Sequence, residues 1–177
     1  MHRLFVAIRP PPAIRSWLLA MMGGVAGARW QDEDRLHLTL RFIGEVDRHL
    51  ARDVDAALAG VHHPGFEVTI EGLGAFERKG SPAAIWAGVS PQEPLRALHK
   101  KIDQALTRVG VEPDRRAYLP HITLARLPRG AGPIGSLIGR SGGAAGPRFR
   151  VDEFRLYRSD LSPDGPTYTA LERYSLG

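Results

Sequence analysis

The chain has 177 residues, of which 43% are hydrophobic and 24% are charged. This composition is typical of a globular protein with a buried core and excludes a disordered chain. The absence of cysteine excludes disulfides, a thiol nucleophile and a thiolate metal site, and the net charge of +5 suits an anionic partner such as RNA.

The first half of the chain predicts a strand, a helix, a second strand and a second helix. Leu4 to Ile8 is a short apolar run typical of a buried strand, and the helix that follows the prolines at 10–12 ends at Gly23-Gly24. The segment from Arg35 to Ile43 alternates like a strand, with one face formed by Leu36, Leu38, Leu40 and Phe42 and the other by His37, Thr39 and Arg41. Asp47 is suited to cap a helix with an apolar stripe at Leu50, Val54, Leu58 and Val61.

The second half predicts more strands and one long helix. Phe66 to Leu73 and Ala83 to Val89 are predicted strands joined by a turn-rich segment, and an amphipathic helix follows over about Pro94 to Val109. A strand is predicted at Tyr118 to Leu127. A glycine-rich stretch from Pro128 to Pro147 then predicts one short helix around residues 134–138 and a mobile loop.

Two last strands are predicted at Arg148 to Tyr157 and Thr167 to Tyr174, with a turn at Ser162 to Pro166 between them. This order is not a regular series of strand–helix–strand units. It indicates an α+β fold with a mostly antiparallel sheet and outer helices. We expect one domain over residues 1–177.

No apolar segment reaches the roughly 20 residues that a membrane span requires. The N-terminal apolar run ends at Ile8 and is too short for the apolar region of a signal peptide. We therefore expect a cytoplasmic protein without membrane contact, and we take it to be a monomer.

The two predicted strands at 35–43 and 118–127 carry the same short motif, His37-Leu38-Thr39-Leu40 and His121-Ile122-Thr123-Leu124. Residues two apart on a strand point the same way, so each motif places an imidazole and a hydroxyl on one face. A single copy is a weak signal in an ordinary strand. Two copies, each on the polar face of a predicted strand, point to a shared site.

A pair of imidazoles facing one small volume suits in-line substitution at phosphorus. Such a reaction needs a base on the side of attack and an acid on the side of the leaving group. Histidine titrates near pH ~6.5, so it can take either role near neutrality. The hydroxyls of Thr39 and Thr123 are suited to donate to phosphoryl oxygens.

Several other residues are weaker candidates for the site. Strand alternation places Arg41 on the face of His37, either in the cleft or as a solvated charge at the strand end. Phe5 and Trp86 could stack a base, but aromatic residues in apolar strands are more often core. His49 and His99 lie within predicted helices, and we expect them on the surface. His62-His63 lies in a loop without carboxylates at ligand spacing, so we expect no metal there, and we expect no cofactor.

The chain resembles the two-histidine phosphoesterase superfamily, and within it the RNA 2′,3′-cyclic phosphodiesterases, once called 2′-5′ RNA ligases. The matching stretches span nearly the whole chain, in the family's order and spacing: 3–8 (RLFVAI), 36–46 (LHLTLRFIGEV), 85–89 (IWAGV) and 120–126 (PHITLAR). The paired motif is specific for the superfamily, and residues 42–45 and 125–126 point to the RNA-end group.

The resemblance implies a bilobal fold of two pseudo-symmetric halves with the active site in the cleft between them. It implies hydrolysis of a terminal RNA 2′,3′-cyclic phosphate to a 2′-phosphomonoester. It also implies that His37 is the proton donor and His121 the proton acceptor, with Thr39 and Thr123 binding phosphate. Ligation of 2′-5′ RNA ends is the reverse reaction of the same site. The implied partner is RNA with a cyclic phosphate end, such as a tRNA fragment, or a cyclic nucleotide.

Arg126 matches a position of the family that contacts phosphate. Strict alternation from His121 would turn its side chain to the opposite face. It can reach the site only if the strand ends or bulges after Leu124.

Two other functions stay open. The cleft could hold RNA ends without catalysis, in which case no cyclic phosphate is turned over. Alternatively, the enzyme could act on small cyclic nucleotides or 2′-5′ oligonucleotides, which a comparison of rates on a cyclic mononucleotide and on RNA would separate.

Overall fold

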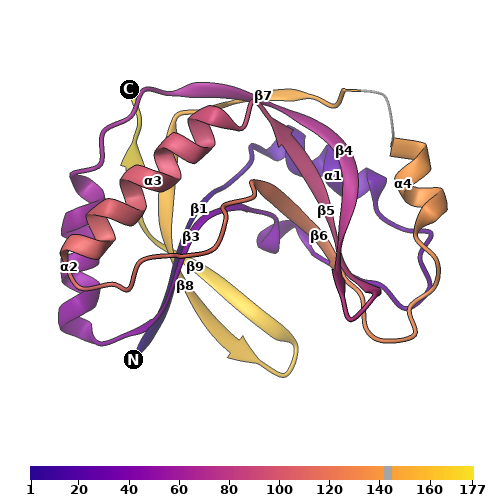
Figure 1. Cartoon of the computed structure of the whole chain (residues 1–177), viewed down its shortest axis with the longest axis horizontal. Helices are drawn as coiled ribbons and strands as arrows, with labels where there is room; N and C mark the ends of the chain where they lie inside the picture. Colours follow the sequence, from indigo (N-terminus) through magenta and orange to yellow (C-terminus); the bar gives the residue numbers. More distant parts are fainter. Residues whose placement is uncertain (142–144) are drawn as a thin grey trace.

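The computed structural model describes residues 1–141 and 145–177 (Figure 1). Its helices are α1 (Pro12–Met21), α2 (Arg48–Ala59), α3 (Glu93–Arg108) and α4 (Gly135–Ser141), with a 3-10 turn at Glu33–Arg35. Its strands are β1 (His2–Ile8), β2 (Arg29–Trp30), β3 (Leu38–Val46), β4 (Phe66–Arg78), β5 (Ser81–Ser90), β6 (His121–Arg126), β7 (Arg148–Val151), β8 (Glu153–Ser162) and β9 (Gly165–Ser175). The predicted α+β class is confirmed.

The strands form one sheet in the order β7-β4-β5-β6-β3-β1-β8-β9, and β2 pairs with β6. The pairings between the described strands are antiparallel. The middle of the sheet is its weakest join, because β3 and β6 share a single bridge, Leu38 with Ile122. The sheet therefore has two arms, β7-β4-β5-β6 and β3-β1-β8-β9, which lie on either side of the middle of the molecule in Figure 1.

The long helices cover the outer side of the sheet because each carries a stripe of apolar side chains. Helix α3 buries Leu95, Leu98, Ile102 and Leu106. It follows β5 in the chain yet packs on β3, in the other arm, together with α2. Helices α1 and α4 lie on the side of β4 (Figure 1). Since α1 follows β1, the chain exchanges helices between its two arms, and a continuous apolar core joins them.

Several predicted boundaries shift by a few residues, and the differences at the β4–β5 hairpin and within the strand predicted from Arg148 to Tyr157 have a structural reason. Strands β4 and β5 run on through the segment predicted as a turn, because Lys79 (φ 51°) and Gly80 (φ 78°) form a tight two-residue hairpin turn. The predicted strand from Arg148 to Tyr157 is divided at Asp152. Its first part pairs with β4 and its second with β1, so the chain passes from one arm to the other there.

The short helix predicted in the glycine-rich stretch is confirmed as α4. Part of the mobile loop predicted after it, at residues 142–144, lies outside the described residues. No helix among those described is long and apolar enough to cross a bilayer.

Candidate active site

The single bridge between the two arms brings the two His-x-Thr motifs together. Continuing the antiparallel register from Leu38 and Ile122 places His37 opposite Thr123 and Thr39 opposite His121. The apolar residues of both motifs are almost completely buried: Leu38, Leu40, Ile122 and Leu124. Because residues alternate along a strand, the histidines and threonines lie on the other face, where all four are half-buried.

Both imidazoles are oriented in the same way. The Nδ1–H of His37 donates to the carbonyl oxygen of Arg35 at 2.7 Å, and that of His121 donates to the carbonyl of Leu119 at 2.6 Å. A carbonyl can only accept, so each bond fixes the proton of the neutral ring on Nδ1. Each Nε2 is then free to accept a proton, or to donate one when the ring is charged.

Aromatic rings support each histidine. Phe5 lies 5.1 Å from the ring of His37, and Tyr168 packs edge-on against it at 5.2 Å. Phe76 packs edge-on against His121 at 4.8 Å, with Trp86 at 6.3 Å. Phe5 is only 4% exposed, so it packs behind His37 and is not available to stack a base.

The same surroundings disfavour the charged form of both rings. The pKa of His37 is lowered from 6.5 to about 4, with burial as the largest cause; the hydrogen bond to Arg35 opposes the shift, and nearby His121, Arg9 and Arg126 add to it. Burial also lowers the pKa of His121, opposed by its bond to Leu119. These surroundings favour neutral imidazoles near pH 7, and an anion between them would raise both pKa values.

Arg41 is not a cleft residue, and the prediction from strand alternation is wrong. Ala7 pairs with Thr39 but Val6 pairs with Arg41, so Leu40 is an extra residue that forms a bulge and reverses the alternation. Arg41 is 5% exposed, and its Nε donates to Oδ1 of Asp103 on α3 at 2.8 Å. Its other nitrogens donate to backbone carbonyls of Phe42 and Glu112, so this arginine joins β3 to the structure outside the cleft.

A bulge at the matching position of β6 has the opposite effect on Arg126. Trp86 pairs with Thr123 but Ile85 pairs with Ala125, so Leu124 is the extra residue. Ala125 is fully buried while Arg126 is exposed. The condition under which Arg126 could share the face of His121 is therefore met. Its charge is felt by both His37 and Tyr168, which places it beside the cleft.

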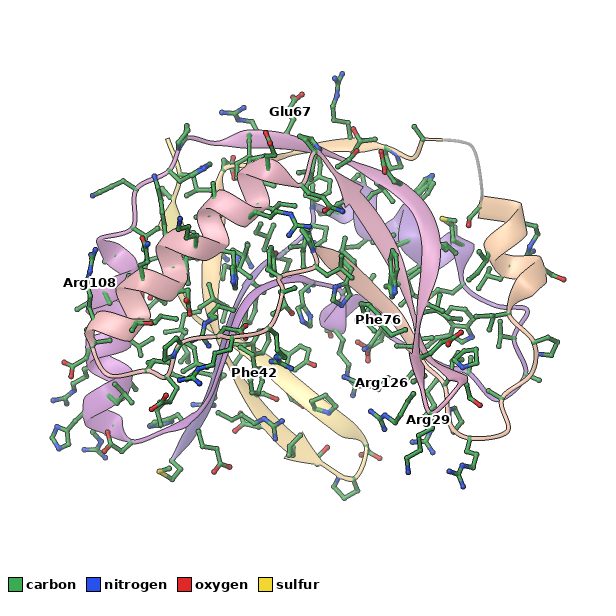
Figure 2. All side chains as sticks on the ribbon, in the orientation of Figure 1. Arg29, Phe42, Glu67, Phe76, Arg108 and Arg126 are labelled. Atoms are coloured by element: carbon green, nitrogen blue, oxygen red, sulfur yellow. The ribbon has the colours of Figure 1, made fainter. Side chains whose placement is uncertain are left out.

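Strand alternation predicted that Phe42 lies on the apolar face. The bulge at Leu40 exposes it instead. It is 41% exposed, and the guanidinium of Arg3 lies 5.5 Å from its ring centre. Its position in β3 corresponds to that of Arg126 in β6, five residues after the histidine in each motif. The repetition of the two motifs is the sequence signal that could have found it. Figure 2 labels both residues, one on each arm.

The prediction that His99 lies on the surface is also wrong. Its Nδ1–H donates to the carbonyl of Leu40 at 2.5 Å, and its ring stacks on Tyr118 at 4.2 Å. The Tyr118 hydroxyl in turn donates to the carbonyl of Thr39 at 2.9 Å. Beyond the bridge at Leu38, β3 no longer pairs with β6, so these two side chains satisfy carbonyls that the sheet leaves open.

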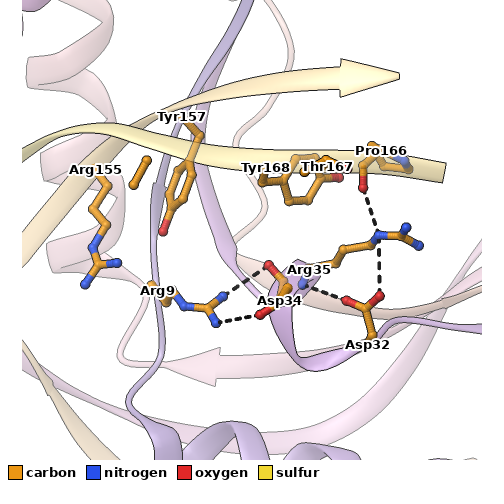
Figure 3. A pocket seen from close by; sticks show the side chains of 10 residues that line it. Arg9, Asp32, Asp34, Arg35, Arg155, Tyr157, Pro166, Thr167 and Tyr168 are labelled. Atoms are coloured by element: carbon orange, nitrogen blue, oxygen red, sulfur yellow. Dashed lines mark hydrogen bonds and ion pairs between the residues drawn. The ribbon is translucent and has the colours of Figure 1, made fainter. Parts of the chain in front are cut away.

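Two cavities adjoin the histidine site, and Tyr168 lines both. One, of about 290 Å³, lies between Arg9, Arg155 and the aromatic pair Tyr157 and Tyr168 (Figure 3). The other, of about 460 Å³, extends from Arg126 to the turn between β8 and β9. In the part of the chain that the structure describes, no three or more His, Asp or Glu side chains gather as a metal site would require.

Comparison with known proteins places this arrangement in a family. The profile of the 2′-5′ RNA ligase superfamily matches residues 10–163. An RNA 2′,3′-cyclic phosphodiesterase of Archaeoglobus fulgidus is 31% identical over 172 residues, which is 96% of this chain and 97% of that protein. One from Escherichia coli is 31% identical over 184 residues, 99% of this chain and 97% of that protein.

Solved structures of similar proteins share the fold of this chain. E. coli LigT complexed with 3′-AMP superposes with a TM-score of 0.79 at 28% identity, covering 99% of this chain and 98% of that one. A structure from Thermus thermophilus gives a TM-score of 0.81 at 28% identity, covering 98% and 97%.

Proposed function

Because this chain belongs to the 2′-5′ RNA ligase superfamily, we propose that it hydrolyses the 2′,3′-cyclic phosphate at an RNA end to a 2′-phosphomonoester, with His37 and His121 as acid and base. The curated relatives that match nearly its whole length are named for this activity. The observation that supports these roles is the pair of imidazoles at the join of β3 and β6, each with Nδ1 bonded to a carbonyl and with no hydrogen bond to Nε2 from the described residues.

The reaction assigns one proton transfer to each histidine. Nε2 of His121 accepts a proton from water as the water oxygen attacks phosphorus. The P–O3′ bond breaks, and the Nε2–H of protonated His37 donates to the leaving O3′. The product carries its phosphate on O2′, and the two rings exchange protonation states. Thr39, Thr123 and Arg126 donate to the non-bridging oxygens, where negative charge increases.

The low pKa of His37 is compatible with its role as acid only in the presence of substrate. A cyclic phosphodiester carries one negative charge, and placing it beside the ring favours the imidazolium. The anion also offsets the charge of Arg126, one of the groups that lower the pKa of His37. Substrate binding therefore promotes protonation of the acid.

The exposed ring of Phe42 is suited to stack the base of the terminal nucleotide. Stacking of one base on an aromatic side chain contributes on the order of 1–3 kcal/mol and tolerates any base. Such a contact suits a site that recognises an RNA end by its phosphate and has little preference for the base.

A substrate with sulfur in place of O3′ tests the assignment of the two histidines, because a thiolate leaves without needing a proton. His37→Ala should recover much of its lost rate on this substrate, and His121→Ala should not. His49→Ala, a change at an exposed helix residue, is the matched control. Recovery in His121→Ala instead would reverse the roles, and recovery in neither would refute acid–base catalysis by this pair. Failure of the unmodified enzyme to open any cyclic phosphate would favour a binding protein without catalysis.

A further inference from the structure

Two arginines face each other beside the histidine site without a counter-charge. Arg29 of β2 pairs directly with Arg126 of β6, and both are exposed. Within residues 1–141 and 145–177 neither guanidinium forms an ion pair. Figure 2 labels both arginines. Like charges directly opposite on neighbouring strands are destabilising. A polyanion lying along this edge would remove that cost.

The cavity of about 460 Å³ lies beside this pair, and charged side chains form part of its wall. Three arginines and one aspartate line it: Arg29, Arg35, Arg126 and Asp164. Asp164 is exposed and forms no ion pair within the described residues, so its carboxylate does not neutralise Arg29 or Arg126. The charge balance of the lining is therefore positive and favours an anionic ligand.

Arg35 holds the opposite wall in place. Its Nε donates to the carbonyl of Pro166 at 2.9 Å and another nitrogen donates to that of Asp164 at 3.0 Å, which ties the β8–β9 turn to the segment before His37. Gly165, at φ 105°, permits this contact, since a Cβ there would lie 2.9 Å from the guanidinium. The arginine is thus engaged, and Arg29 and Arg126 are the cations left for a ligand.

Aromatic surface completes the cavity. Trp30 and Tyr168 line it, and both are half-buried. Tyr168 also packs edge-on against His37, so one ring connects the cavity to the catalytic site. Arg126 is likewise shared between the cavity and the reacting phosphate of the proposed mechanism. A group that fills the cavity would therefore lie directly next to that phosphate.

We propose that this cavity binds the nucleotide next to the cyclic end of the RNA, with Arg29 on the internal phosphodiester and the base against Trp30 or Tyr168. The inference rests on the proposed function and names its substrate class. The enzyme prefers oligonucleotides that contain at least one charged internal linkage over cyclic mononucleotides.

The test compares three substrates: adenosine 2′,3′-cyclic phosphate, the dinucleotide ApA ending in the same cyclic phosphate, and that dinucleotide with an uncharged methylphosphonate linkage. The unmodified enzyme should show a kcat/KM at least about tenfold higher on the charged dinucleotide than on the mononucleotide, as expected for a charge-assisted phosphate contact. Arg29→Gln should remove most of this ratio, and Arg29→Lys should retain more of it. On the methylphosphonate the ratio should be small in every variant.

Salt dependence and a matched control complete the test. On the charged dinucleotide, Arg29→Gln should make log kcat/KM fall less steeply with log salt concentration, by about 0.7 for one lost contact to a single strand. Arg52→Gln, the same charge change at an exposed position on α2, should change neither ratio nor slope.

The outcomes separate the subsite from the proposed function. If the unmodified enzyme opens all three substrates with equal kcat/KM, or if Arg29→Gln lowers kcat/KM equally on all three, the proposed function stands and the subsite is refuted. If the unmodified enzyme opens none of them, the proposed function fails and this inference fails with it.

Discussion

His37 and His121 are the same residue type in the same short motif, yet their surroundings make them different. His37 is enclosed by Phe5 and Tyr168 and is affected by the charges of Arg9 and Arg126. His121 lies against Phe76, with burial as the main influence on its pKa. Burial is the largest influence on the pKa of both rings, and the charges of Arg9 and Arg126 act in addition on His37.

Replacing either of the two histidines of the proposed mechanism should abolish most of the activity and leave the fold intact. His37→Ala and His121→Ala are each expected to lower kcat by about 10²–10⁴, because each removes one proton transfer. Initial rates on RNA with a 2′,3′-cyclic phosphate end, with circular dichroism to verify folding, measure this effect. Turnover like that of the unmodified enzyme in either variant would contradict the mechanism.

The low pKa of His37 also predicts how stability depends on pH. The unfolded ring takes up a proton near pH 6.5 and the folded ring only near pH 4, so the free energy of unfolding falls as pH drops through this window. The loss from this residue is at most about 3 kcal/mol, at roughly 1.4 kcal/mol per pH unit. Urea unfolding at pH 7 and pH 4 should show a smaller difference in His37→Gln. An unchanged difference would mean that the folded ring titrates normally.

At the scale of elements, the two bulges determine which side chains of β3 and β6 are buried and which are exposed. The extra residues Leu40 and Leu124 turn the next residue of each strand into the core and the one after it outward. One strand thereby presents Phe42 and the other Arg126. The chain uses the same backbone device twice to place an aromatic ring on one arm and a cation on the other.

Arg41 should therefore matter for stability and hardly at all for substrate binding. Arg41→Met leaves the carboxylate of Asp103, which is 21% exposed, without its partner. Breaking a buried ion pair in this way costs about 3–5 kcal/mol. Urea unfolding should show this loss, whereas KM of the folded enzyme should stay close to that of the unmodified protein. A raised KM with unchanged stability would mean that Arg41 contacts the substrate in the cleft.

At the scale of the whole molecule, the site exists only where the two arms meet. Each arm supplies one histidine and one threonine, and the helices exchanged between the arms hold them in a common core. The proposed mechanism therefore draws its acid, its base and its phosphate contacts from both arms together.

Activity should accordingly persist when divalent ions are removed. In the proposed mechanism the two histidines activate water and protonate the leaving group, which are roles that a metal ion would otherwise supply. We expect an unchanged kcat in excess EDTA, measured after dialysis against the chelator. Loss of activity with recovery on adding one divalent ion would contradict this.

The sequence alone determined most of the elements and singled out the two histidine motifs that the structure brings together, because both follow from local patterns. Apolar periodicity specified α1, α2 and α3, and the repeated His-x-Thr-Leu marked the strands that carry the site. Periodicity could not specify Arg41, Phe42 and Arg126, because strand alternation holds only while the register is unbroken. The bulges that break it arise from pairing with β1 and β5, which are distant in the chain. The juxtaposition of Arg29 with Arg126 likewise exists only in the folded sheet, since backbone pairing between remote strands leaves no local pattern in the sequence.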